Sequence, residues 1–183
     1  MHNNSKAQLE ALKNYAMQFP VGAARRTAFL NGLSPIHVAW HSLPVSHGFL
    51  LFHWEVIKQF KAVGGPAQFG GVTAFTMMQL NNFRAPYNVN VTVAQGDTAA
   101  LRGFSADIQN WHNDAHMRIQ MATGLNMMNA GTNIYLREFW QLHYFINARF
   151  ETKLGNYRHV ANQPIPAVIA HIETNHHNAV PRI

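Results

Sequence analysis

The chain has 183 residues and a formal net charge of +6; only 12% of its residues are charged, while 48% are hydrophobic. This composition predicts one folded domain over residues 1–183 and excludes a disordered chain. The absence of cysteine excludes disulfides, thiolate zinc sites and iron–sulfur clusters, so any metal must be held by histidine or oxygen ligands.

The pattern of apolar residues predicts helices along most of the chain. From the N-terminus, residues 5–18 and 23–31 predict two short helices, and Ser34–Pro35 then predicts a new helix start. Residues 49–63 carry a stronger amphipathic pattern that ends at Gly64–Gly65–Pro66, and residues 72–83 predict a further helix.

The second half of the sequence contains the one clear strand signal and the longest helices. Residues 87–93, YNVNVTV, alternate apolar and polar side chains as a half-buried strand does. Asp97 is a suitable N-cap for a long helix to about Ala122, and residues 134–150 and 167–174 predict two more helices. The expected fold is therefore mainly α, a helical bundle with long loops and little β structure.

Several of the 12 histidines fall on the faces that these helices turn to the interior. His112 and His116 are four residues apart, and His53 and His143 each lie in an apolar stripe of another helix. A single buried histidine is usually satisfied by a backbone carbonyl. Three helices that each direct imidazoles inward favour a shared metal, because every buried polar ring needs a partner.

The ligand types narrow the choice of metal. The stretch His112–His116 reads HNDAH and lacks the glutamate of a zinc protease, and the chain has too few inward glutamates for a di-iron carboxylate bundle. Ligation by imidazole alone suits copper, zinc, iron or nickel, and copper fits this set of histidines best, so copper is the predicted metal. The sequence also lacks a basic stripe, a signal-like N-terminus and an apolar run that could cross a bilayer. We therefore expect a cytoplasmic protein that binds neither nucleic acid nor membranes.

Two stretches together resemble the copper-binding signatures of the tyrosinase, catechol oxidase and haemocyanin family of type-3 dicopper proteins. HGFLLFH (His47–His53) resembles the first signature, and WHNDAH followed by FWQLHYFIN (Phe139–Asn147) resembles the second. Trp54 and Asn147 stand where the family signatures usually have arginine and aspartate. The resemblance implies a four-helix core with two copper ions, each held by three histidines, and O2 as co-substrate.

The resemblance also implies which residues bind and act. The second copper would be held by His112, His116 and His143. The first would be held by His53 with His47 and one of His37 and His41, or by His53 with His37 and His41 as a second i, i+4 pair. Asn113 stands where family members that deprotonate phenols often have asparagine, and Asp107 is a candidate for the missing acidic partner, as is Asp114.

The expected function is a copper oxidase or monooxygenase that converts phenols, catechols or aminophenols to quinones. Two alternatives remain open: a dioxygen- or copper-binding protein without turnover, and a helical protein with one histidine-held metal. The expected partner is a small phenolic or catecholic substrate. The sequence leaves open both a homo-oligomer and a protein that delivers copper.

Overall fold

The computed structural model of this protein describes residues 5–42 and 48–175. These residues form helices and connecting loops without a strand, which confirms the predicted mainly-α class. The α-helices are α1 (Ser5–Ala16), α2 (Ala23–His41), α3 (Phe49–Ala62), α4 (Met77–Asn82), α5 (Thr98–Thr123), α6 (Arg137–Tyr157) and α7 (Ile165–Asn175). Two short 3₁₀ helices, η2 (Gly65–Phe69) and η3 (Asn133–Tyr135), lie in the connections.

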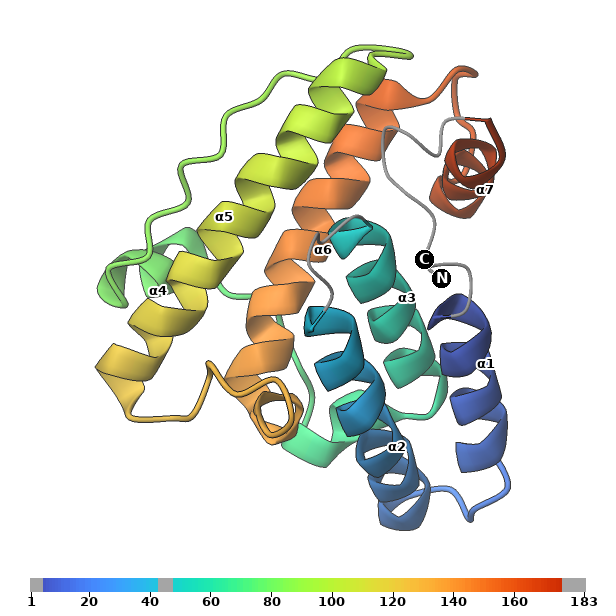
Figure 1. Cartoon of the computed structure of the whole chain (residues 1–183), viewed down its shortest axis with the longest axis vertical. Coiled ribbons are helices and arrows are strands. Elements are labelled where there is room, and N and C mark those ends of the chain that lie inside the picture. The colour runs from blue at the N-terminus through green and yellow to red at the C-terminus, as the bar shows by residue number, and fades with distance from the viewer. Residues whose placement is uncertain (1–4, 43–47, 176–183) are drawn as a thin grey trace.

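Helices α2, α3, α5 and α6 form the centre of the molecule (Figure 1). Helix α6 contacts both α3 and α5, and α3 also contacts α5, so these helices enclose a common interior. Helix α1 packs on the outside of α2 and α3, and α7 packs on α6. No helix among the described residues is long and apolar enough to span a membrane.

The expectation that a helix over residues 23–31 ends at Gly32 and a new one starts at Ser34–Pro35 is wrong, because α2 is continuous from Ala23 to His41. Gly32 does not end it but allows close packing, since a Cβ there would lie 2.3 Å from Leu12 Cδ1 of α1. Pro35 lies inside the helix and lacks the backbone N–H that would bond to the preceding turn. Tertiary packing of α2 against α1 and α3 outweighs these local signals.

Both long helices exist as predicted, but the start and the end of α6 differ from the predicted bounds. Asp97 accepts a hydrogen bond from the Ala100 backbone N–H at 2.9 Å and caps α5, which ends at Gly124 with φ of 74°. Helix α6 begins at Arg137 rather than at residue 134, because Leu136 has an extended backbone after η3. It ends at Tyr157, seven residues beyond the predicted end at residue 150.

The predicted strand is also wrong, since residues 85–94 form neither a strand nor a helix. Val89 and Val93 are buried while Asn88, Asn90 and Thr92 are exposed, so the alternation reflects packing of one side of an isolated segment. A strand needs a neighbouring strand, and none exists among the described residues. The helix expected over residues 72–83 is shortened to α4, which Thr76 begins with a capping box.

The core is continuous through the described helices and is rich in aromatic rings. Phe60 of α3 stacks on Trp140 of α6 with 3.6 Å between ring centroids and 6° between ring planes, and both rings are fully buried. This pair fixes α3 against α6, the two helices that each carry a central histidine.

We expect Phe60→Ala to lower the free energy of unfolding by about 3–5 kcal/mol, because it leaves a cavity beside Trp140. The measurement is urea denaturation of the metal-free protein. Tyr15→Ala is the control, since Tyr15 is 52% exposed and its loss should cost less than about 1 kcal/mol. Equal effects of the two substitutions would contradict the core position of Phe60.

Candidate metal centre

Two groups of three histidines meet between the four central helices. In each group the potential ligand atoms lie within 4.8 Å of one another. We name them triad A, formed by His37 and His41 of α2 with His53 of α3, and triad B, formed by His112 and His116 of α5 with His143 of α6. The two i, i+4 pairs lie on single helix faces, so two helices supply four of the ligands.

Backbone carbonyls fix the ring orientations in triad B. His143 Nδ1 lies 2.8 Å from the Phe139 carbonyl oxygen, and His116 Nδ1 lies 2.7 Å from the Met127 carbonyl oxygen. A carbonyl oxygen can only accept, so Nδ1 of both rings carries the proton and Nε2 keeps a lone pair. His112 Nδ1 donates in the same way to Asn113 Oδ1 at 3.1 Å.

Triad A follows the same rule in two of its three rings. His37 Nδ1 donates to the Ala130 carbonyl at 2.8 Å, and His53 Nδ1 donates to the Phe49 carbonyl one helical turn earlier at 2.9 Å. His41 contributes its Nε2, which lies 3.0 Å from His37 Nε2. Five of the six rings thus have a defined tautomer that leaves Nε2 free to bind an ion.

The Nε2 atoms face one another, which is unfavourable without a cation. His112 Nε2 and His143 Nε2 are 3.1 Å apart, although the Nδ1 bonds leave both with lone pairs and no proton to share. The Nε2 atoms of His53 and His116 are buried and have no hydrogen-bond partner. Two nitrogens bound to one ion at about 2.0 Å lie up to about 4 Å apart. The short nitrogen–nitrogen distances and the two unpartnered buried atoms therefore fit a metal ion in each triad.

Burial keeps these imidazoles neutral at pH 7. It lowers the pKa of His37 to about 3, with a further contribution from neighbouring His41, and it lowers the pKa of His116 to about 4. Burial, followed by neighbouring imidazoles, also lowers the pKa values of His53, His112 and His143 well below 6.5. The side chain of His41 is exposed, yet desolvation among its neighbours lowers its pKa to about 4. Neutral rings are the form that binds metals.

The triads touch each other, and aromatic rings enclose them. His53 stacks on His143 with 4.6 Å between ring centroids, so triad A and triad B share a boundary. Phe49 packs on His53 and also on His112, at 4.5 and 4.7 Å between centroids. Phe139 stacks on His143 at 4.0 Å and meets His37 edge-on at 5.3 Å. Each of these two phenylalanines therefore holds rings of both triads in an apolar wall.

Comparison with known proteins leaves the family open, since no family model, curated protein or solved structure matches this chain. The assignment of the site therefore rests on its own geometry.

The structure brings together six of the seven predicted metal ligands. His37, His41 and His53 form one group, so the i, i+4 alternative for the first site agrees with the geometry; His112, His116 and His143 form the other. His47 lies outside the described residues.

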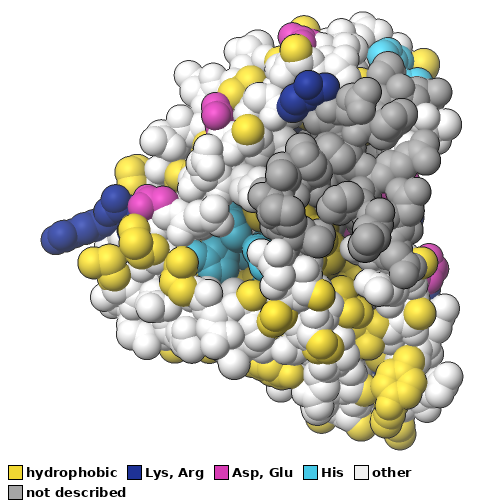
Figure 2. All heavy atoms as spheres, in the orientation of Figure 1, with side chains coloured by type: hydrophobic (Ala, Val, Ile, Leu, Met, Phe, Trp, Pro, Cys, Tyr) yellow, Lys and Arg dark blue, Asp and Glu magenta, His cyan; other side chains and the backbone are white. Residues whose placement is uncertain are grey.

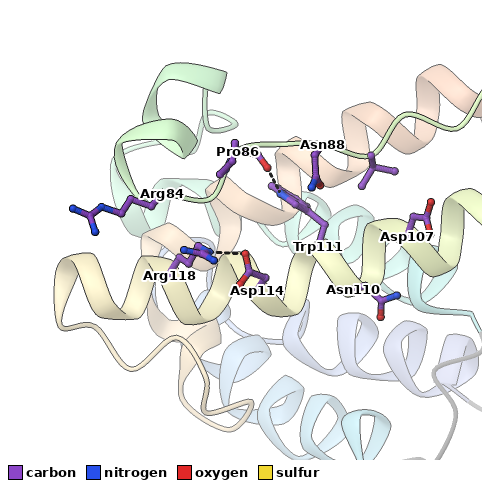
Figure 3. A pocket seen from close by; sticks show the side chains of 9 residues that line it. Arg84, Pro86, Asn88, Asp107, Asn110, Trp111, Asp114 and Arg118 are labelled. Atoms are coloured by element: carbon purple, nitrogen blue, oxygen red, sulfur yellow. Dashed lines mark hydrogen bonds and ion pairs between the residues drawn. The ribbon is translucent and has the colours of Figure 1, made fainter.

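The two predicted catalytic residues lie apart from each other. Asn113 is exposed and accepts the hydrogen bond of the His112 ring, so it orients a candidate ligand. Asp107 is on another face of α5 and lines a surface groove of about 660 Å³ with Trp111, Asp114 and Arg118 (Figure 3). Asp114 pairs there with Arg118 at 2.6 Å. No histidine of either triad lines this groove.

A polar link joins α3 and α6 next to the two triads. Glu151 Oε1 accepts hydrogen bonds from Trp54 Nε1 at 3.2 Å and from Asn147 Nδ2 at 2.9 Å. Trp54 follows His53 directly, and Asn147 lies one turn after His143. Trp54 and Asn147 are two of the departures from the family signatures, and Glu151 connects them through its carboxylate.

The centre is open to solvent on the side of His41, the exposed member of the triads. Histidine side chains are visible at the surface between α5 and α2, with hydrophobic side chains beside them (Figure 2). Met117, which follows His116 in sequence, is 42% exposed, and Val38, which follows His37, is 40% exposed.

Sequence reasoning missed the groups that orient the rings. The carbonyls of Met127 and Ala130 come from the loop between α5 and α6, and backbone carbonyls leave no signature in a sequence. Asn133, which is buried and donates to the Met127 carbonyl at 3.0 Å, was also missed. The asparagine-rich stretch MNAGTN was the only available hint, because buried asparagines often satisfy loop backbone.

We expect the metal-free protein to lose stability as the pH falls below 6.5. The histidine pKa is 6.5 in the unfolded chain and about 3 to 4 for His37 and His116 in the folded one, so the unfolded state binds more protons between these values. Stability from these groups is complete above pH 6.5 and declines by up to about 1.4 kcal/mol per pH unit for each fully buried ring.

Urea denaturation at a series of pH values measures this slope. His53→Phe, which replaces one buried imidazole by an apolar ring among Phe49, Phe52 and Trp40, should make the slope shallower. Stability that stays constant from about pH 6.5 to 5 would show that the rings are not held neutral.

Proposed function

We propose that this protein is a dinuclear copper oxidase that uses O2 to convert small catechols, phenols or aminophenols to quinones. The observation that carries this proposal is the meeting of two adjoining triads of neutral imidazoles, with Nε2 atoms facing inward. The resemblance of the sequence around His53, His112 and His143 to type-3 copper signatures supports the same reading.

The ligand set favours copper over the alternatives. All six ligands are imidazoles, and neither triad includes a carboxylate. Magnesium, calcium and manganese prefer oxygen ligands, and non-haem iron oxygenases use two histidines with one carboxylate. Zinc accepts imidazoles, but a single zinc would use one triad and leave the lone pairs of the other unpartnered.

Copper in the two triads would supply O2 binding and one-electron redox steps. In catechol oxidation, each catechol gives up two electrons and two protons to become a quinone. One O2 takes up the electrons and protons of two catechols and gives two waters. In phenol hydroxylation, one oxygen atom of O2 enters the ring, and a catechol supplies the two electrons and two protons that convert the other atom to water.

The residues of the chain have three tasks in this chemistry. The Phe139, Met127, Ala130 and Phe49 carbonyls hold four rings in one tautomer, so their Nε2 atoms stay available as ligands. The rings of Phe49 and Phe139 keep water from the inner sides of the triads. The open side at His41 admits the substrate.

Asn113 is the polar group that we place at the substrate entrance. It is exposed on α5, and its Oδ1 accepts the hydrogen bond of the His112 ring, so it holds that ligand in place. Proton removal from a phenol would then fall to a water molecule at the entrance. Asp107 lies in the groove on another face of α5 and has no part in this proposal.

The first test is copper loading. The metal-free protein should bind about two copper ions per chain, one for each triad, and show an absorption band in the near ultraviolet that depends on O2. His143→Ala should leave about one tightly bound copper and remove the band, because triad B loses a ligand next to His53 of triad A. Metal analysis and optical spectroscopy under nitrogen and then air measure both effects.

His159→Ala is the matched control for copper loading. It removes an imidazole that lies beside His171 rather than in either triad, so stoichiometry and spectrum should not change. Persistence of the O2-dependent band in His143→Ala, or binding of one zinc with no copper, would overturn the dicopper assignment.

The second test distinguishes an oxidase from an oxygen-binding protein. Because His41 leaves triad A open to solvent, the copper-loaded protein should oxidise a simple catechol with consumption of one O2 for each two quinones. His116→Ala should lower this rate by about 100-fold or more, since loss of groups that merely orient ligands already costs 10–100-fold. Reversible O2 binding without quinone formation would show a carrier instead.

A further inference from the structure

One loop orients a histidine of each triad. The loop between α5 and α6, residues 124–132, presents the Met127 carbonyl to His116 Nδ1 at 2.7 Å and the Ala130 carbonyl to His37 Nδ1 at 2.8 Å. His116 belongs to triad B and His37 to triad A. The backbone from Met127 to Ala130 therefore connects the two triads, in addition to the contact of His53 with His143.

Side chains at both ends hold this loop in place. On one side, the buried Asn133 donates to the Met127 carbonyl at 3.0 Å, so that carbonyl accepts from Asn133 and from His116 together. On the other side, Ser34 of α2 donates to the Gly131 carbonyl at 2.7 Å, directly after Ala130. The Asn129 carboxamide oxygen accepts from the Gly131 backbone N–H at 2.9 Å and closes the turn between them.

We infer that the α5–α6 loop couples the two metal sites, so that an ion in one triad raises the affinity of the other, with Asn133 and Ser34 as the positioning residues. This inference rests on the dinuclear centre proposed above but not on copper or on oxidation chemistry. A metal ion at Nε2 makes the opposite N–H of an imidazole a stronger donor. An ion in triad B therefore tightens the bond from His116 to the Met127 carbonyl.

The consequence passes along the loop to triad A. A fixed Met127 restricts Ala130, whose carbonyl holds His37 in the tautomer and orientation that a metal needs. Asn133 and Ser34 keep the backbone between Met127 and Ala130 from relaxing, so the restraint reaches His37 and the second ion meets a ring that is already oriented. The coupling works equally in the other direction, because linkage between binding sites is reciprocal.

The test is calorimetric titration of the metal-free protein with Zn²⁺, which binds imidazoles without redox chemistry. The quantity compared is the ratio of the two stepwise binding constants in different variants. Repulsion between the two ions lowers this ratio equally in every variant and cancels in the comparison. Asn133→Ala and Ser34→Ala should each lower the ratio by about fivefold or more relative to the unsubstituted protein.

Thr152→Ala is the control, because Thr152 makes a comparable bond to the Ala148 carbonyl on the exposed side of α6, away from the loop. It should leave the ratio unchanged. An unchanged ratio in Ser34→Ala and Asn133→Ala would overturn the coupling. If Asn133→Ala does not fold, the ratio measured for Ser34→Ala is the test of the coupling. Ser34 is only partly buried, so its substitution should leave the fold intact.

A second readout follows the loop itself. In His53→Ala, which disables triad A, Zn²⁺ bound to triad B should slow hydrogen exchange of the His37 Nδ1–H seen by nuclear magnetic resonance. The slowing should be lost when Ser34→Ala is added. Absence of slowing in His53→Ala overturns the coupling. Failure of the unsubstituted protein to bind two zinc ions overturns the dinuclear centre itself, so the two proposals fail by different results.

Discussion

Every imidazole in a protein interior has two nitrogens, and each must have a partner. In this protein, one nitrogen of each of His37, His53, His116 and His143 is satisfied by a backbone carbonyl, and the other faces a neighbouring histidine or no partner at all. An apolar interior makes this arrangement costly unless a cation joins the facing nitrogens. The pattern of hydrogen bonds therefore defines the centre more firmly than the count of histidines does.

The carbonyls that satisfy these rings come from two kinds of structure. Phe49 and Phe139 lie one helical turn before His53 and His143, so α3 and α6 each supply a ligand and its support within a single helix. Met127 and Ala130 lie in a loop, and the rings that they hold come from α5 and α2. The first arrangement is rigid because the helix is rigid. The second depends on how the loop is anchored to its surroundings.

The sequence allowed a correct prediction of the helical class. Residue spacing also directed His53, His112, His116 and His143 toward one interior, where the structure brings them together, because helix faces follow directly from spacing. The family resemblance offered His37 and His41 only as alternatives beside His47. The sequence did not predict the continuous α2, since Gly32 and Pro35 are signals of termination whose effect depends on packing with α1. It favoured a strand at residues 87–93, although alternation alone cannot show that a partner strand exists. The sequence placed Asp107 on α5, but it could not show that Asp107 faces a surface groove away from the histidines. That orientation depends on which side of α5 packs against α6.

The two i, i+4 histidine pairs have a consequence for folding. His37 with His41 and His112 with His116 are close in sequence, so each pair can chelate an ion as soon as one helical turn forms. Ions would thus bind to the unfolded chain as well as to the native one, and they would stabilise the native state by less than their native affinity alone implies. An excess of metal during refolding would stabilise partly helical chains in which only one pair binds an ion. His53 and His143 lie on other helices than the pairs, so they would add a third ligand, and with it affinity, only in the native state.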